Sequence, residues 1–339
     1  MLELLPTGVG PATVAQFSSR CISLNHMIRR WMSDGGNVAA PPWVRTFLRG
    51  QLRRVKPKFG YTPAVKTDLL LIPMGARWTD MRAAAGAADE AGFDGVWTWD
   101  HLRDPDGDPT GVPECMMTLA ALGEVTQRIA LGSLVLNVSN RHPGLLANMA
   151  ATLQQISNGR FILGLGAGGS RSTPYAREQE GLGLSVEPDA VRAQRVVEAA
   201  QILRRLWAGD TSSFAGSHYR LDRPAGYLRC DPAPAIVIGG FGPRMAAIAG
   251  KHGDGFNTQA RHPQLAGLAR IARDEHKAAG HDPAKFSLSV FAGLAPAWLR
   301  ADSENRAALA RPDVDRLILL IEPPYDASQI RAAGRVLSG

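Results

Sequence analysis

The stretch at 128–170 constrains the fold more than any other part of the chain. Two short, nearly continuous apolar runs, at 129–136 and 161–165, occupy its two ends. Such runs are typical of strands buried on both faces, as in a parallel sheet. Between them, four apolar residues recur at spacings of four, four and three, which places them on one face of a helix. These residues are Leu145, Met149, Leu153 and Ile156.

Both ends of this helix carry recognisable signals. Pro143 stands where the first turn should begin, and Gly159 lies just past the last turn. A strand, a helix and a strand with tight connections predict a βαβ unit, in which the two strands run parallel. The segments 137–142 and 166–170 should therefore face each other across the edge where both strands end.

The alternation of strands and helices continues along the chain from residue 67. The pattern predicts eight strands and eight helices, the number that a (β/α)8 TIM barrel of typically about 250 residues requires. An open, doubly wound sheet also alternates, but eight uninterrupted pairs favour a closed barrel. The predicted strands are 68–74, 95–100, 129–136, 161–165, 235–239, 255–259, 286–294 and 316–321, and the other predicted helices are 79–91, 114–126, 189–207, 243–251, 263–279, 303–310 and 327–337.

The excess of positive charge lies in the first 66 residues. The formal net charge is +7, and residues 1–66 contain ten Lys and Arg against Glu3 and Asp34, so the remaining 273 residues have a net charge of −1. We expect two parts, a basic and poorly ordered N-terminal extension at 1–66 and the barrel at 67–339. The alternative is a basic arm that contacts an anionic surface or a partner. The high pI is no argument for nucleic-acid binding by the barrel.

The remaining composition narrows the class of protein. Cys21, Cys115 and Cys230 are scattered without a CxxC pair, which excludes a disulfide scaffold and a zinc ribbon and fits a reducing cytoplasm. No apolar run is long enough to span a membrane. The histidines form no HxH or HExxH pair, so we predict no metal. We expect a cytoplasmic protein with a small-molecule substrate, and a homodimer is compatible with the sequence.

Five segments, in this order, resemble the luciferase-like flavin and deazaflavin oxidoreductases, which are TIM barrels. The resemblance runs from about Lys66 to the C-terminus. It implies a flavin-type ring bound at the carboxyl ends of the strands. The segments are DGVWTWDHL at 94–102, LGSLVLNVSNRHP at 131–143, SNGRFILGLGAGG at 157–169, IVIGGFGPR at 236–244 and HGDGFN at 252–257.

The resemblance implies an oxidoreductase that transfers a hydride between a deazaflavin, coenzyme F420, and an unknown small organic substrate. The segment at 141–143 and the glycine-rich strand exits resemble the deazaflavin branch, and the barrel is compact. The first alternative is an FMN-dependent luciferase-like monooxygenase. The second is a non-catalytic barrel that binds a ligand or a partner. The predicted anion site at 238–244 and His101 both argue against this second alternative.

The glycine-rich segment GLGAGG at 164–169 matches the GxGxxG pattern of dinucleotide-binding proteins. We reject a Rossmann unit because no helix follows directly and no apolar strand precedes Asp189. The resemblance implies instead that Gly166, Gly168 and Gly169 let a flat ring or a phosphate approach the backbone. A tight exit from the strand is the alternative interpretation.

The segment IGGFGPR at 238–244 predicts an anion site. A strand runs into two glycines, and a helix begins at Pro243. Backbone N–H groups, the positive end of the helix dipole and a guanidinium converge there, as a cofactor phosphate requires. A short connecting turn is the alternative. The residues predicted to bind the cofactor here are Gly239, Gly240, Gly242 and Arg244.

Asp100 and His101 end the second predicted strand. In the deazaflavin-dependent sugar-phosphate dehydrogenases that this chain resembles, the histidine matching His101 is the proposed base for the substrate hydroxyl. A structural histidine bonded to a loop is the alternative. Those dehydrogenases carry a Glu, their proposed acid, where this chain has Gly169. This departure puts sugar-phosphate oxidation in doubt.

The remaining predicted cofactor residues also follow from the resemblance. Leu134 and Val135 match the position of a non-prolyl cis peptide that supports the ring in deazaflavin members. Asn137 and Thr258 lie at the ends of predicted strands. Arg141 and His142 most simply anchor the loop before the third helix, and a role near the cofactor is the alternative.

Overall fold

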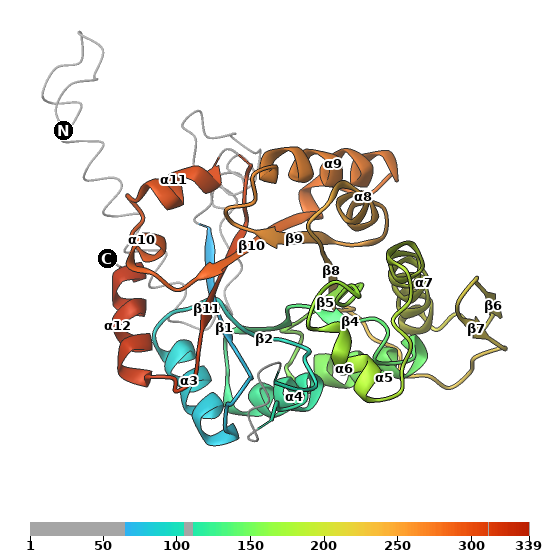
Figure 1. The fold of residues 1–339 in the computed structure, drawn as a ribbon, viewed down its shortest axis with the longest axis horizontal. Helices are drawn as coiled ribbons and strands as arrows, with labels where there is room; N and C mark the ends of the chain where they lie inside the picture. The colour runs from blue at the N-terminus through green and yellow to red at the C-terminus, as the bar shows by residue number, and fades with distance from the viewer. Residues whose placement is uncertain (1–64, 105–110, 311, 339) are drawn as a thin grey trace, which may run out of the picture. The chain divides into compact units, whose positions relative to one another are not determined.

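The computed structural model describes residues 65–104, 111–310 and 312–338. Within these residues, parallel strands form a closed ring in the order β1, β2, β3, β5, β8, β9, β10, β11 and back to β1 (Figure 1). This closure confirms the predicted TIM barrel. The strands are β1 (Lys66–Leu71), β2 (Gly95–Thr98), β3 (Ala130–Ser133), β4 (Leu136–Asn137), β5 (Phe161–Gly166), β8 (Ala235–Gly239), β9 (Gly255–Gln259), β10 (Ser287–Gly293) and β11 (Arg316–Ile321).

Each predicted helix has a counterpart in the described residues, and two further short helices were not predicted. The counterparts are α3 (Trp78–Glu90), α4 (Cys115–Val125), α5 (Pro143–Ile156), α7 (Asp189–Ala208), α8 (Pro243–His252), α9 (Leu265–Ala278), α11 (Glu304–Ala310) and α12 (Ala327–Ser338). The additions are α6 (Ala176–Gly181) and α10 (Pro296–Leu299), with the 3-10 turn η1 (Pro283–Lys285). Residues 209–234 carry a small antiparallel pair, β6 (Phe214–Ala215) and β7 (Arg220–Leu221). None of the described helices is long and apolar enough to cross a membrane.

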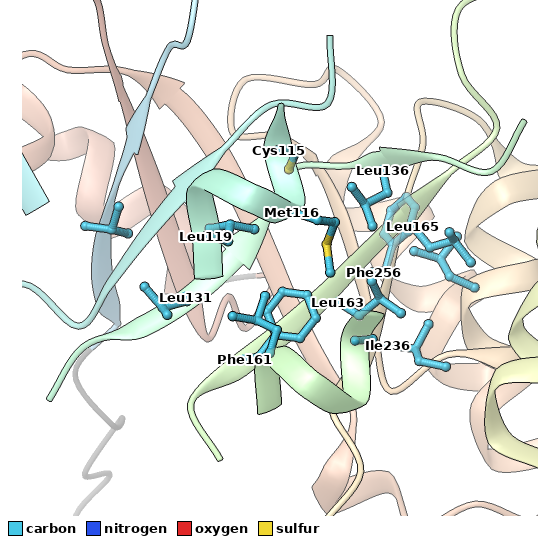
Figure 2. Packing of buried hydrophobic residues seen from close by; sticks show 14 of the residues in the cluster. Cys115, Met116, Leu119, Leu131, Leu136, Phe161, Leu163, Leu165, Ile236 and Phe256 are labelled. Atoms are coloured by element: carbon cyan, nitrogen blue, oxygen red, sulfur yellow. The ribbon is translucent and has the colours of Figure 1, made fainter. Parts of the chain in front are cut away.

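The main core lies between the strands and the surrounding helices. Alternate residues of each strand point outward, because successive side chains of a strand face opposite sides of the sheet. Figure 2 shows Leu119 of α4 packed near Leu131 and Phe161, with Leu163, Leu165 and further outward residues beside them. A smaller cluster fills the barrel interior and consists of Leu70, Trp97, Leu134 and Ile318.

The interior near the amino ends of the strands is polar. Arg316 of β11 forms a hydrogen-bonded ion pair with Asp68 of β1, and the Trp97 Nε1–H donates to the same carboxylate at 2.6 Å. Asp68 is fully buried. The Trp97 ring occupies the space beside Gly132, where a Cβ would approach it to 2.1 Å. A buried ion pair and one large ring therefore lie in the interior at this end of the barrel.

The predicted N-terminal extension lies outside the described residues, except for its last two. β1 begins at Lys66, and all of the strands that close the ring follow it. We therefore expect a chain that lacks residues 1–60 to fold, because the barrel's described core and pairing come from later residues. Thermal melting followed by circular dichroism checks this, with the full chain as control. Loss of the cooperative transition would show that the extension is part of the folding unit.

Candidate active site

The carboxyl ends of the strands bring most of the predicted site residues to one end of the barrel. His101 follows β2, Asn137 ends β4, Gly166 ends β5, and Gly239 ends β8. In a barrel of parallel strands these positions share one rim, which is where TIM-barrel sites are built.

Asp100 fixes the loop that follows β4. Its carboxylate accepts a bidentate pair of hydrogen bonds from Arg141, at 2.8 and 2.7 Å, and another from the Asn137 N–H at 2.9 Å. Arg141 also bonds to Glu114. Burial lowers the pKa of Arg141, but its bonds to the two carboxylates outweigh this and raise that pKa above the usual value. His142 Nδ1 accepts the Gly144 N–H at 3.1 Å at the start of α5, so the predicted anchoring role of this pair is confirmed.

His101 is held by a carboxylate that the sequence did not reveal. Its Nδ1 lies 2.6 Å from Oε1 of Glu178, and Oε2 of Glu178 accepts the Leu102 N–H at 3.0 Å. Glu178 comes from α6, in the connection after β5, and its side chain is buried. A six-residue helix has too few residues to show a period, so the only signal was an acidic residue in a loop predicted to share the rim with His101.

Two aromatic side chains orient the His101 ring. Tyr175 stacks on it with ring centroids 4.5 Å apart, and Trp99 contacts it edge-on at 5.6 Å. Among the described residues, Nε2 of His101 has no hydrogen-bond partner, and it is not among the buried polar atoms that lack one. The imidazole is therefore fixed in place with one nitrogen accessible.

Val135 gives two of the predicted glycines a packing role. The Leu134–Val135 peptide bond is cis. A Cβ on Gly166 would lie 2.4 Å from the Val135 side chain, and a Cβ on Gly239 would lie 2.9 Å from it. These two glycines leave room for the Val135 side chain. A contact of Val135, Gly166 or Gly239 with a cofactor ring stays a prediction.

At the two glycines after β5, neighbouring side chains leave no room for a Cβ atom. Gly168 has a φ of +73°, a conformation that side chains rarely adopt, and a Cβ there would meet the Asn137 amide at 2.5 Å. A Cβ on Gly169 would lie 2.8 Å from Cβ of Tyr175. The backbone of this loop is thus packed directly against the side chains that surround His101.

The start of α8 has the features predicted for an anion site. Gly242 is the N-cap residue without a side-chain cap bond, and a Cβ added there would meet no atom within 4 Å. The N–H groups of Arg244 and Met245 have no acceptor among the described residues, and the exposed Arg244 side chain has no partner there. Gly240, in contrast, donates its N–H to Asn257 O at 3.0 Å and packs against Met245.

Thr258 lies near the carboxyl end of β9, but its side chain is on the face that packs against the helices. It is fully buried, and it lies two residues after Phe256, so both side chains point to the same face of β9. Phe256 packs in the core between the strands and the helices. Because β9 points its alternate residues, such as Asn257, into the barrel, a cofactor contact of Thr258 is not supported by its position.

A cavity of about 480 Å3 opens at the opposite end of the barrel, where the strands begin. Arg316, Arg128 and Arg160 line it, but their charges and donors are largely used within the protein. Arg316 pairs with Asp68, and Arg160 makes five hydrogen bonds to backbone and hydroxyl oxygens. This end of a TIM barrel serves stability, so we place the functional site at the carboxyl ends.

The closed barrel, with polar groups gathered at the carboxyl ends of its strands, defines a protein of the TIM-barrel class. The chain belongs to the luciferase-like monooxygenase family, whose model matches residues 58–334. This confirms the resemblance noted in the sequence. The family alone does not fix the cofactor or the substrate.

Individual relatives are similar over part of their length. An F420-dependent glucose-6-phosphate dehydrogenase of Nakamurella multipartita is 37% identical over 190 residues, which cover 55% of this chain and 54% of that protein. An F420-dependent hydroxymycolic acid dehydrogenase of Mycobacterium tuberculosis is 33% identical over 202 residues, or 59% of this chain and 54% of that protein. The chain thus spans about half the length of the curated relatives it matches.

A solved structure extends the similarity of fold over the whole barrel. The F420-dependent secondary alcohol dehydrogenase in complex with an F420–acetone adduct superposes with a TM-score of 0.68 at 19% identity, and the match covers 81% of this chain and 98% of that one. At this identity the likeness shows the fold.

Proposed function

We propose that the protein is an F420-dependent oxidoreductase that interconverts an alcohol and its carbonyl compound. The observation that carries this proposal is the presence of two features on the same rim of the barrel. His101 presents an accessible ring nitrogen, and the start of α8 presents unpaired N–H groups with Arg244. The names of the similar dehydrogenases, all F420-dependent, support the same cofactor.

The residues at the start of α8 fit a cofactor phosphate. A phosphate bound there would accept the N–H groups of the first helical turn and would complement the helix dipole. Gly242 leaves the approach open, and the Arg244 guanidinium adds a positive charge. When bound, F420 supplies a ring carbon that accepts or returns a hydride, while the protein supplies position and electrostatics.

His101 would accept the proton of the substrate hydroxyl in oxidation and would return a proton in reduction. An imidazole is a common general base, and His101 follows β2 on the rim where we propose that the ring binds. Asp100 and Arg141 hold the neighbouring loop in place. A sugar phosphate is not the favoured substrate, because Gly169 stands where the similar sugar-phosphate dehydrogenases carry their proposed acid.

The family description favours one further candidate, an FMN-dependent monooxygenase. The two candidates differ in cofactor, so separate fluorescence titrations of the purified apoprotein with F420 and with FMN distinguish them. We expect micromolar binding of F420 and much weaker binding of FMN. Micromolar binding of FMN with no binding of F420 would make the monooxygenase the leading candidate.

A further inference from the structure

We propose that Glu178 is a positioning residue that holds His101 in the tautomer protonated at Nδ1, so that Nε2 exchanges the proton of the substrate hydroxyl. This inference rests on the proposed function and assigns a role to a residue that sequence reasoning missed. Glu178 acts through His101 and is not itself placed against the substrate.

The hydrogen bonds of Glu178 determine which ring nitrogen carries the proton. An ionised carboxylate only accepts hydrogen bonds. Oε1 lies 2.6 Å from Nδ1, and Oε2 already accepts the Leu102 N–H at 3.0 Å. Nδ1 must therefore be the donor, and in the neutral imidazole Nε2 is then the acceptor. A carboxylate in this place also stabilises the imidazolium that forms when Nε2 takes a proton.

The packing around His101 restricts the ring to this geometry. Tyr175 covers one face, Trp99 meets the ring edge-on, and Glu178 holds Nδ1. Among the described residues, Glu178 and Tyr175 are the titratable groups in contact with the ring. Asp100, its neighbour in the chain, is neutralised by the bidentate pair with Arg141. Nε2 is the ring nitrogen left for a ligand.

The carboxylate near His101 comes from α6 and not from the position of Gly169. At Gly169 a side chain has no room, because its Cβ would lie 2.8 Å from Cβ of Tyr175 and 2.8 Å from Oγ1 of Thr173. A carboxylate cannot be built there without displacing the ring that stacks on His101. Nine residues later in the chain, α6 places the carboxylate of Glu178 against His101.

The proposed step balances in both directions. In oxidation, the substrate O–H bond would break and its proton would pass to Nε2, while a bound deazaflavin would take the carbinol hydrogen together with the electron pair of the C–H bond. A C=O bond forms, and the imidazolium, still bonded to Glu178, then releases a proton to solvent. In reduction, Nε2 donates the proton to the carbonyl oxygen as the hydride arrives at carbon.

Glu178→Gln tests the role, because glutamine keeps the shape of the side chain but loses the charge and one acceptor. We expect kcat to fall by about 10-fold to 100-fold, with KM little changed and with F420 affinity equal to that of the wild type. The acid limb of the profile of kcat/KM against pH should move to lower pH. Glu180→Gln, which changes an exposed carboxylate on the same helix, is the matched control and should behave as the wild type.

A second measurement depends neither on activity nor on the folding of Glu178→Gln. Nitrogen NMR of the full chain with labelled histidine, assigned by the signal that His101→Asn removes, should show wild-type His101 protonated at Nδ1. An Nε2-protonated ring in the wild type, or unchanged kcat and pH profile in Glu178→Gln, would overturn the proposal. Failure of the wild type to bind F420 would instead contradict the proposed function, so the two failures are distinguishable.

Discussion

Replacing Arg316 with methionine is expected to destabilise the barrel by about 3–5 kcal/mol at neutral pH, the usual cost of leaving a buried charge without its partner. Arg316 forms the ion pair with Asp68, and Asp68 is fully buried with its Oδ1 lacking a partner among the described residues. Methionine fills much of the same volume without a charge. The free energy of unfolding, measured by urea denaturation, checks the size of the effect.

The loss should become smaller as the pH falls. Burial raises the pKa of Asp68, and the Arg316 charge opposes that rise. Without Arg316 the carboxyl binds its proton more tightly in the folded state than in the unfolded state. Such a group favours folding at low pH and loses this contribution as the pH rises through its folded pKa. We therefore expect Arg316→Met to regain stability, relative to the wild type, as the pH falls from neutrality toward the usual pKa of an aspartate.

The double variant Asp68→Asn with Arg316→Met is the control. It removes the charge that the single variant leaves behind, while an amide oxygen still accepts the Trp97 N–H. It should therefore be more stable than Arg316→Met at neutral pH. Equal stability of the single and double variants would show that the ion pair is not what holds this end of the barrel.

The barrel could be predicted because its physical causes are local in the sequence. Strands buried on both faces appear as apolar runs such as 161–165, and the helices between them repeat apolar residues with a helical period. Strand ends were less certain: β2 ends at Thr98, before the predicted end at residue 100. Helix α3 begins at Trp78, one residue before the predicted start.

The site was only partly predictable, because contacts between distant residues leave no periodic signal. A histidine and an anion-binding helix start can be recognised from residue types at strand ends. Glu178 could not be recognised in this way, because α6 is too short to show a periodic pattern. Glu178 also lies 77 residues along the chain from His101. Likewise, the sequence indicates that Gly166 is small but not that Val135 occupies the space beside it.

Thr258 shows a second kind of limit. Its place near a strand end suggested a cofactor contact, but the face of the strand on which it lies depends on register. One residue's shift exchanges the two faces, because side chains alternate along a strand. In the structure Thr258 shares the face of Phe256 and is fully buried. A position at a strand end therefore makes a residue a candidate for a site, but whether its side chain faces the barrel interior or the helices determines whether it can contribute.

Gly242→Asp is expected to weaken F420 binding by roughly a hundredfold or more. Each tenfold loss of affinity corresponds to about 1.4 kcal/mol, and two like charges about 4 Å apart repel by about 4 kcal/mol at an effective dielectric constant of about 20. A carboxylate at this N-cap position would lie where we propose that the cofactor phosphate binds. It would also accept the N–H groups of the first turn of α8.

The fold should tolerate this change, which separates lost binding from lost structure. Gly242 has φ −141° and ψ 167°, an extended conformation that any residue adopts, and a Cβ there meets no atom within 4 Å. Aspartate is moreover a favoured N-cap residue, so the melting temperature should stay the same or rise slightly. Gly240 offers a poorer test, since a Cβ there would lie 2.3 Å from Cβ of Met245.

Gly242→Ser is the matched control for charge. A serine caps the same N–H groups and occupies similar space, but it is neutral, so the difference between the two variants isolates the repulsion between the carboxylate and the phosphate. Fluorescence titration of F420 into the wild type and both variants should give a far weaker affinity for Gly242→Asp than for Gly242→Ser. That difference should shrink as salt is added, because exposed charges are screened. Equal F420 affinity of the two variants would place the phosphate elsewhere on the rim and would remove the start of α8 from the cofactor site.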